Sequence, residues 1–199
     1  MSVNSVTHRG LRARAAAVAL GLAALLGGCS DESADSAGSG AQTFNDADVK
    51  FAQTMIPHHE QAVEMADAIL GKSGTSPEVT QLAQQIRDTQ RPQMETLTGF
   101  LTAWNQPLIP DHASEAHEDH WDAEGMLTPE EMQALAAADG PTGQKLFIEG
   151  MIQHHEGALT MVQAEIDDGE NPDAVQLAQS IKAGQMGEME TMKRLLADL

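Results

Sequence analysis

Residues 55–65 read Met-Ile-Pro-His-His-Glu-Gln-Ala-Val-Glu-Met, and residues 151–161 read Met-Ile-Gln-His-His-Glu-Gly-Ala-Leu-Thr-Met. The second segment therefore repeats the first at a spacing of 96 positions. Extending the alignment from Phe51/Phe147 to Ala66/Val162 gives sixteen pairs, of which eight are identical. Self-similarity at a fixed spacing is the signature of a duplicated structural unit, so we expect two equivalent halves.

The first segment has the pattern of a helix with one buried face. On an α-helix, its two histidines and two methionines fall on one arc of about 120°. Three apolar residues share this arc, namely Phe51, Ala66 and Ile69, and three acidic residues lie opposite, namely Glu60, Glu64 and Asp67. This pattern predicts imidazoles that point into the core. A buried imidazole costs free energy unless it is hydrogen-bonded or bound to a metal.

The first 28 residues have the features of a bacterial lipoprotein signal peptide. Three arginines precede an apolar stretch at residues 15–26, and Leu26-Gly27-Gly28-Cys29 resembles a lipobox. Twelve apolar residues are too few to span a bilayer core of ~30 Å. We expect Cys29, the only cysteine, to carry a lipid that anchors the protein outside the cytoplasm, at the cell surface or on the periplasmic side. The alternative is a plain secretory signal with an incidental cysteine.

The expected mature chain is strongly acidic. The formal charge of −19 becomes −22 when the three arginines of the signal peptide are removed. Such a surface repels nucleic acid and attracts cations, so we exclude nucleic-acid binding and expect metal ions as partners. Residues 29–43 are rich in Ser, Gly, Ala and Asp and predict a flexible tether before a single domain at residues 44–199.

The remaining sequence predicts an all-α fold, with repeat halves at about 46–104 and 142–199. Capping residues, prolines and glycines give the expected helices: Asp46 or Asp48 to Leu70, Pro77 to about Trp104, Pro129 to about Asp139, Thr142 to near Gly169, and Pro172 to Leu199. Gly140 and Pro141 are expected to end the short helix, and Pro57 to kink the first one. Four long helices and one short one, without strand-like alternation, predict a four-helix bundle of two duplicated hairpins.

Bringing the two His-bearing helices together would gather imidazole and thioether groups. The candidate metal residues are Met55, His58, His59, Met65, Met151, His154, His155, Met161, Glu188 and Met192, with Glu188 as an acceptor for an imidazole N–H. Gln93 is its counterpart in the first half. Soft, neutral ligands select Cu(I), whereas thioether is a poor ligand for Zn²⁺, Mg²⁺ or Ca²⁺.

Other interpretations stay open at this point. Methionine also fills irregular cores, and buried histidines could serve as a pH-sensitive core in an interaction lipoprotein without metal. A metal-dependent redox enzyme of the di-iron type would need Glu-x-x-His pairs that face the bundle interior, and no long helix carries one. Glu60 and Glu156 follow the histidines but point outward. We therefore predict no enzymatic activity.

The predicted loop at residues 106–127 carries three further histidines, His112, His117 and His120, among acidic residues. Exposed imidazole and carboxylate groups favour Cu(II) or Zn²⁺ with weak affinity. This segment is either a loose metal-collecting site or a solvated loop.

The motif Met-Ile-Pro-His-His-x-x-Ala-x-x-Met-Ala, followed one helix later by Ile-x-x-x-Gln, resembles the bacterial domain-of-unknown-function family 305, which includes copper-binding proteins of the CopM type. The resemblance covers residues 44–199. It implies a ferritin-like four-helix fold and a role in copper sequestration or resistance, with an unidentified copper-transfer partner. The second half keeps the family's Gln185, Glu188 and Met192, whereas the first half has Gln93 and Leu97 after Gln90 and so departs from the pattern.

Overall fold

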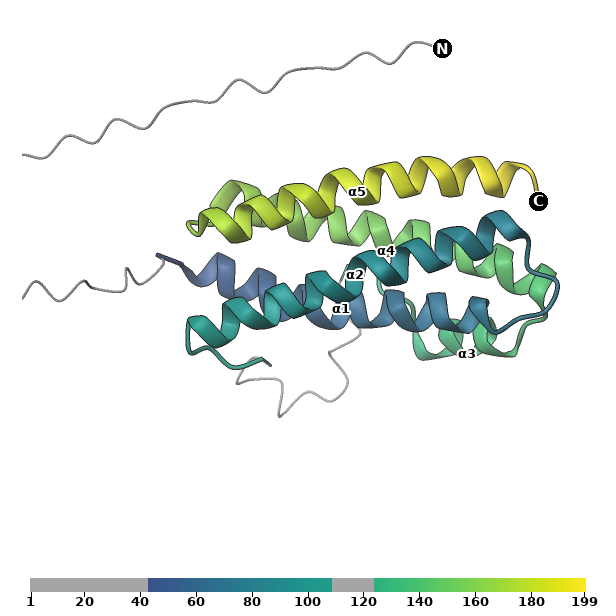
Figure 1. Cartoon of the computed structure of the whole chain (residues 1–199), viewed down its shortest axis with the longest axis horizontal. Helices are drawn as coiled ribbons and strands as arrows, with labels where there is room; N and C mark the ends of the chain where they lie inside the picture. Colours follow the sequence, from purple (N-terminus) through teal and green to yellow (C-terminus); the bar gives the residue numbers. More distant parts are fainter. Residues whose placement is uncertain (1–42, 109–123) are drawn as a thin grey trace, which may run out of the picture. The chain divides into compact units, whose positions relative to one another are not determined.

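The computed structural model describes residues 43–108 and 124–199, and within these ranges every regular element is a helix (Figure 1). The predicted signal peptide, Cys29, most of the predicted tether, and the three loop histidines lie outside the described residues. The helices are α1 (Asp46–Leu70), α2 (Pro77–Ala103), α3 (Pro129–Ala137), α4 (Gly140–Asp168) and α5 (Pro172–Ala197). The prediction of an all-α chain with four long helices and one short helix is confirmed.

Most helix starts lie where the capping residues placed them. The side chains of Asn45, Ser76, Thr128 and Asn171 each accept hydrogen bonds from backbone N–H groups of the first turn. At α1 and α3 the side chain of the residue three positions later accepts a hydrogen bond from the backbone N–H of the capping residue, which completes a capping box. Prolines stand in the first turn of α2, α3 and α5, where a missing N–H is harmless.

The predicted start of the second His-bearing helix is wrong by two residues. Helix α4 begins at Gly140 because Asp139 Oδ1 accepts from the Thr142 N–H at 2.8 Å and caps the helix. Pro141 therefore belongs to the first turn and does not end α3. Gly140 is required there, since a Cβ atom would lie 2.0 Å from the carbonyl oxygen of Ser73.

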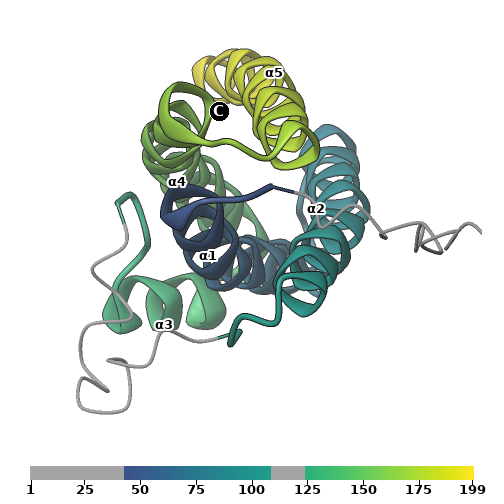
Figure 2. The ribbon, with the colours of Figure 1, turned by 90° about the vertical axis from the view of Figure 1, so that its left-hand side faces the viewer.

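Helices α1 and α4 form the central pair of the bundle. Helix α2 packs along α1, α5 packs along α4, and the direct contact between α2 and α5 is small. The short α3 rests against α1 and α4, on the outside of the bundle (Figure 2). The two hairpins thus meet mainly through the helices that carry the repeated His-His segments.

Two equivalent polar contacts tie the halves together. On α1, Asp48 Oδ1 accepts from the backbone N–H of Asn171, the residue that caps α5, at 2.9 Å. On α4, Gln144 Oε1 accepts from the backbone N–H of Ser76, the residue that caps α2, at 3.0 Å. Positions 48 and 144 are separated by the repeat spacing of 96, so the internal duplication extends to the bonds between the halves.

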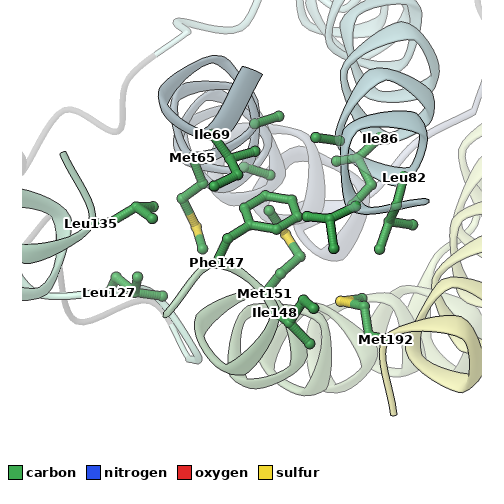
Figure 3. Close-up of a cluster of buried hydrophobic side chains, with 14 of the residues drawn as sticks. Met65, Ile69, Leu82, Ile86, Leu127, Leu135, Phe147, Ile148, Met151 and Met192 are labelled. Carbon is green, nitrogen blue, oxygen red and sulfur yellow. The ribbon is translucent and has the colours of Figure 1, made fainter. Parts of the chain in front are cut away.

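The apolar core consists of two separate clusters. The first joins the C-terminal half of α1 to the N-terminal parts of α2 and α4, with Phe147 between Met65 on one side and Ile86 on the other (Figure 3). The second lies toward the opposite ends of these helices and includes Phe51, Leu101 and Val162. On each long helix, polar residues occupy the positions between the two clusters. We call them the polar layer: His58, His59, Gln90, Gln93, His154, His155, Gln185 and Glu188.

A buried acid near the second cluster gives a pH-dependent stability. Glu165 is 1% exposed. Burial, and to a smaller extent a hydrogen bond to Asp48 and the charge of Asp48, raise the pKa of Glu165 to about 8. The folded protein therefore holds a proton on Glu165 that the unfolded chain, with an ordinary pKa of 4.5, has released at neutral pH.

We expect the free energy of unfolding to fall as pH rises from about 4.5 to about 8, at up to ~1.4 kcal/mol per pH unit from this group. The stability that the proton on Glu165 contributes is fully present below the pKa of this group in the unfolded chain. It is lost as pH rises through the pKa of the group in the folded protein. Urea unfolding at pH 5 and pH 8 measures it, with Glu165→Gln as the comparison. The substituted protein should lose less stability over this interval, and equal losses would contradict the assignment.

Candidate metal centre

The four repeated histidines meet in the polar layer at the middle of α1 and α4. All four are fully buried, as their inward position on the helices predicts. The rings of His58 and His154 are in contact, with centroids 3.7 Å apart and planes inclined by 36°. These two residues occupy equivalent positions of the repeat, so their contact marks the pseudo-two-fold axis between the halves.

The second histidine of each pair has a partner on the neighbouring helix. His59 Nε2 lies 2.8 Å from Gln93 Oε1, and His155 Nε2 lies 2.7 Å from Glu188 Oε2. Amide and carboxylate oxygens only accept hydrogen bonds, so both imidazoles donate from Nε2. The prediction that Glu188 accepts an imidazole N–H agrees with this geometry, and Gln93 has the same role in the first half.

The tautomers leave basic nitrogens inside the layer. His58 Nε2 lies 3.3 Å from the backbone oxygen of Glu124, so it also donates from Nε2. The Nδ1 atoms of His58, His59 and His155 are buried without a hydrogen-bond partner, and so are both ring nitrogens of His154. Leaving a buried polar atom unpaired costs about 1–3 kcal/mol. So many unpaired nitrogens in one layer are not explained by packing.

Burial also keeps these rings uncharged. Desolvation and, to a smaller extent, neighbouring His59 lower the pKa of His58 to about 3, and desolvation lowers the pKa of His59 to about 4. Desolvation and the three other histidines hold the pKa of His154 well below its ordinary value. These three imidazoles are therefore neutral at neutral pH, and neutral imidazole is the form that binds metal ions.

The candidate methionines take different positions. Met55 and Met151 are fully buried one turn before the histidine pairs, and Met192 is fully buried on α5. Met65 is also fully buried and belongs to the first apolar cluster, which contains Met151 and Met192 as well (Figure 3). Met161 is only partly buried, contrary to the expectation that it faces inward like Met65. Met65 shares the first apolar cluster with Leu127 from the segment before α3, whereas Met161 packs against the second cluster and stays partly buried.

A short segment, residues 124–128, begins with a turn and contacts α1 at His58 and α4 at Gly157. We call it the strap. Gln61 binds Leu127 through two hydrogen bonds, from its Nε2 to the carbonyl oxygen at 2.9 Å and from the Leu127 N–H to its Oε1 at 2.8 Å. At the equivalent position on α4, Gly157 lets the strap approach the helix, because a Cβ atom there would lie 1.8 Å from the oxygen of Glu124.

Sequence reasoning missed the strap and the role of positions 61 and 157. Their signal was present, since Gln61/Gly157 is one of the unmatched pairs within the repeated segment. It also missed that Gln90 and Gln185 are buried, with neither the oxygen nor the nitrogen of either amide in a hydrogen bond. Their alignment between the halves was visible, but the sequence does not show that they lack partners.

No group of three or more His, Cys, Asp or Glu side chains in the described ranges is arranged to hold a metal ion. Methionine is not one of these four residue types, so this finding does not concern a site built from imidazole and thioether ligands. The unpaired, neutral imidazole nitrogens suit a soft ion of low charge that accepts few ligands. No helix among the described residues is long and apolar enough to cross a membrane.

Solved structures support the assignment of the fold. The chain is similar to a DUF305 fragment from Deinococcus radiodurans, with 31% identity and a TM-score of 0.68 over 78% of this chain and 98% of the fragment. A protein from Streptomyces coelicolor, described as a secreted DUF305 member, has 30% identity and a TM-score of 0.69 over 76% of this chain and 91% of that one.

A third similar structure is CopM in its Cu(I)-bound form, with 26% identity and a TM-score of 0.61 over 76% of this chain and 96% of CopM. CopM is also known in Cu(II)-bound, silver-bound and apo forms. No curated protein matches the chain significantly. The family model for the domain of unknown function DUF305 matches residues 48–196, which include all four long helices almost completely. The resemblance noted in the sequence is confirmed, and the chain belongs to the DUF305 family.

Proposed function

We propose that this protein binds copper, as Cu(I), between its two halves and serves in copper sequestration or resistance. The observation that carries the proposal is the set of buried imidazole nitrogens without partners in the polar layer. A bound ion would use these lone pairs and remove the cost of leaving them unpaired. The similarity to CopM, which has been crystallised with Cu(I), Cu(II) and silver, supports copper as the cargo.

The ligands would come from both halves. His58 and His154 are in contact, so one ion near their rings would be held across the pseudo-two-fold axis. His59 and His155 offer Nδ1 atoms whose direction is fixed by the bonds from Nε2 to Gln93 and Glu188. Met55 and Met151 lie three residues before His58 and His154 on the same helices, and Met192 lies four residues after Glu188 on α5, so these three are the first candidates for thioether ligands. Met65 and Met161 are weaker candidates because each lies seven residues, about two helical turns, after His58 or His154, and Met161 is also partly exposed.

The cellular setting follows from the N-terminal sequence. We propose a lipoprotein that is cleaved before Cys29 and anchored outside the cytoplasm of a bacterium, and the description of the Streptomyces relative as secreted supports the compartment. The four long helices would form a ferritin-like bundle. We propose that the protein stores copper or passes it on to a transfer partner without transforming a substrate.

Metal analysis of the purified protein tests the proposal. After loading with Cu(I) under reducing, oxygen-free conditions and dialysis against a competing chelator, we expect copper to remain bound, and we expect zinc treated in the same way to be lost. Soft ligands retain Cu(I) and hold Zn²⁺ poorly. Release of copper to a weak chelator, with the protein folded, would favour the alternative of an interaction lipoprotein with a buried histidine core. Retention of iron together with oxidase activity would favour the redox enzyme.

A further inference from the structure

The polar layer contains one acidic side chain, Glu188. We propose that its charge limits the layer to one bound metal ion, and that this ion is monovalent. The inference rests on the proposed copper site and goes beyond it, because it assigns the number and charge of the ions to one residue. It makes Glu188 a specificity-determining residue that acts through His155, without itself being a ligand.

Glu188 is the only charged partner that the described residues bring to the layer. It is 6% exposed and accepts from His155 Nε2 at 2.7 Å, and Gln85 Nε2 approaches its other oxygen at 3.5 Å. None of the lysine and arginine side chains in the described ranges is buried. The remaining layer residues are histidines and glutamines. No lysine or arginine therefore neutralises Glu188 inside the bundle. Its basic neighbour in the layer is His155, which forms an ion pair with it only when protonated and is neutral when it binds a metal ion.

A charge in a dry interior is unfavourable unless an opposite charge lies nearby. Imidazole and thioether ligands are neutral when they bind a metal ion, so they do not balance its charge. One Cu(I) or Ag(I) ion together with Glu188 has no net charge. A single divalent ion, or two monovalent ions, would leave one uncompensated positive charge in the layer. This difference favours one monovalent ion.

The internal repeat provides a natural comparison at the equivalent position. Gln93 holds His59 Nε2 at 2.8 Å, almost the same distance as that between Glu188 and His155 Nε2. Both residues orient an imidazole by accepting its N–H, and only one carries a charge. Exchanging Glu and Gln at these positions therefore changes the charge of the layer while keeping an acceptor for each ring.

Three variants separate charge from orientation. We expect Glu188→Gln to weaken Ag(I) binding by about 10–100-fold, the range for loss of a partner behind a metal ligand. Gln93→Glu should raise the affinity for Cu(II) relative to that for Ag(I), because two carboxylates balance a divalent ion. The double variant Gln93→Glu with Glu188→Gln restores one negative charge, so it should recover most of the parent's Ag(I) affinity.

Silver is the probe because it is monovalent and does not change oxidation state under these conditions. The layer's ion is the one counted by mass spectrometry in the full chain and lost when His58 and His154 are both changed to leucine. Glu190→Gln is the matched control for charge, since Glu190 is exposed on the same helix, and it should leave the affinity unchanged. Gln81→Glu is the matched control for Gln93→Glu, because it adds a negative charge at an exposed position of α2, and it should also leave the affinity unchanged.

The outcomes distinguish this inference from the copper site itself. If the parent binds no ion that depends on His58 and His154, the proposed function fails. If the parent binds one and Glu188→Gln binds silver as tightly, the site stands and the role of Glu188 is overturned. If the double variant stays as weak as Glu188→Gln, the geometry of the carboxylate and not the charge of the layer is decisive, which also overturns the inference.

Discussion

Replacing His58 and His154 together by leucine is expected to weaken Cu(I) binding by more than about 100-fold while leaving the metal-free protein at least as stable as the parent. The loss of affinity should exceed the 10–100-fold effect of removing a residue behind a metal ligand, since these rings would be ligands themselves. Their contact across the pseudo-two-fold axis means that both halves lose a ligand at once.

The expected stability has a separate reason. The two rings place three nitrogens without hydrogen bonds in the interior, namely His58 Nδ1 and both ring nitrogens of His154. Apolar side chains of similar size remove these unpaired groups, together with the contact of 3.3 Å between His58 Nε2 and the backbone oxygen of the exposed Glu124. Replacing buried unpaired groups by apolar ones is nearly neutral or stabilising. Leucine would also join the two apolar clusters across the layer. The histidines would then be present for binding at the expense of stability, which is a common feature of functional sites.

Two measurements check this expectation. Competition with a Cu(I) chelator gives the affinity, and urea unfolding of the metal-free protein gives the stability. The control exchanges Ile56 and Ile152 for leucine, since these equivalent, partly buried positions lie two residues before the rings on the same helices. The variant that loses His58 and His154 should also lose the stabilisation that the parent gains from added Cu(I). Unchanged copper affinity in a folded variant would place the site elsewhere.

A second large effect is expected for Gly157→Ala. The new methyl group would lie 1.8 Å from the carbonyl oxygen of Glu124. The atoms that it meets are backbone atoms of the strap, so no flexible side chain can move aside to relieve the overlap. The strap must therefore move away from α4, which disturbs the bonds between Gln61 and Leu127. Overpacking of this kind costs typically about 1–3 kcal/mol, and the lost hydrogen bonds add to it.

Gly184→Ala on α5 is the matched control. A Cβ atom at Gly184 meets no atom within 4 Å, so alanine should stabilise this helix by about 0.5–1 kcal/mol. The two glycine substitutions should thus shift the urea midpoint in opposite directions. Protease cleavage near residue 124 should become faster in Gly157→Ala only. Equal, small effects of both substitutions would show that the strap adapts without cost.

Much of this structure could be predicted from local signals. The arc that carries His58 and His59 fixed which way the rings point, and the capping residues placed most helix ends within one or two positions. The start of α4 was misplaced because Gly and Pro usually end helices, whereas Asp139 makes them the first turn of one. Met161 was expected to be buried by analogy with Met65. Its partial exposure depends on how the helices pack in three dimensions, and a repeat alignment does not contain that information.

The candidate site was predictable in its residues but not in its contacts. The repeat alignment identified the four histidines and paired Glu188 with Gln93. It could not show that His58 and His154 touch, because this contact depends on how two separate hairpins pack. Nor could it show that the Nδ1 atoms lack partners, since an absent hydrogen bond is a property of the complete interior. The pairing of His58 Nε2 with the strap joins residues that are 66 positions apart.

The position of the His58–His154 contact on the pseudo-two-fold axis has a consequence for the origin of this chain. Two identical copies of one hairpin, associating as a symmetric dimer, would form the same contact between a residue and its own counterpart. Copper binding would then depend on protein concentration, because the site would exist only when two subunits meet. Joining the copies in one chain makes their encounter intramolecular. It also allows differences that a symmetric dimer cannot have, since any substitution there appears twice. Glu188 at the position equivalent to Gln93, and Gly157 at the position equivalent to Gln61, are differences of this kind, which one chain can hold and a dimer of identical hairpins cannot.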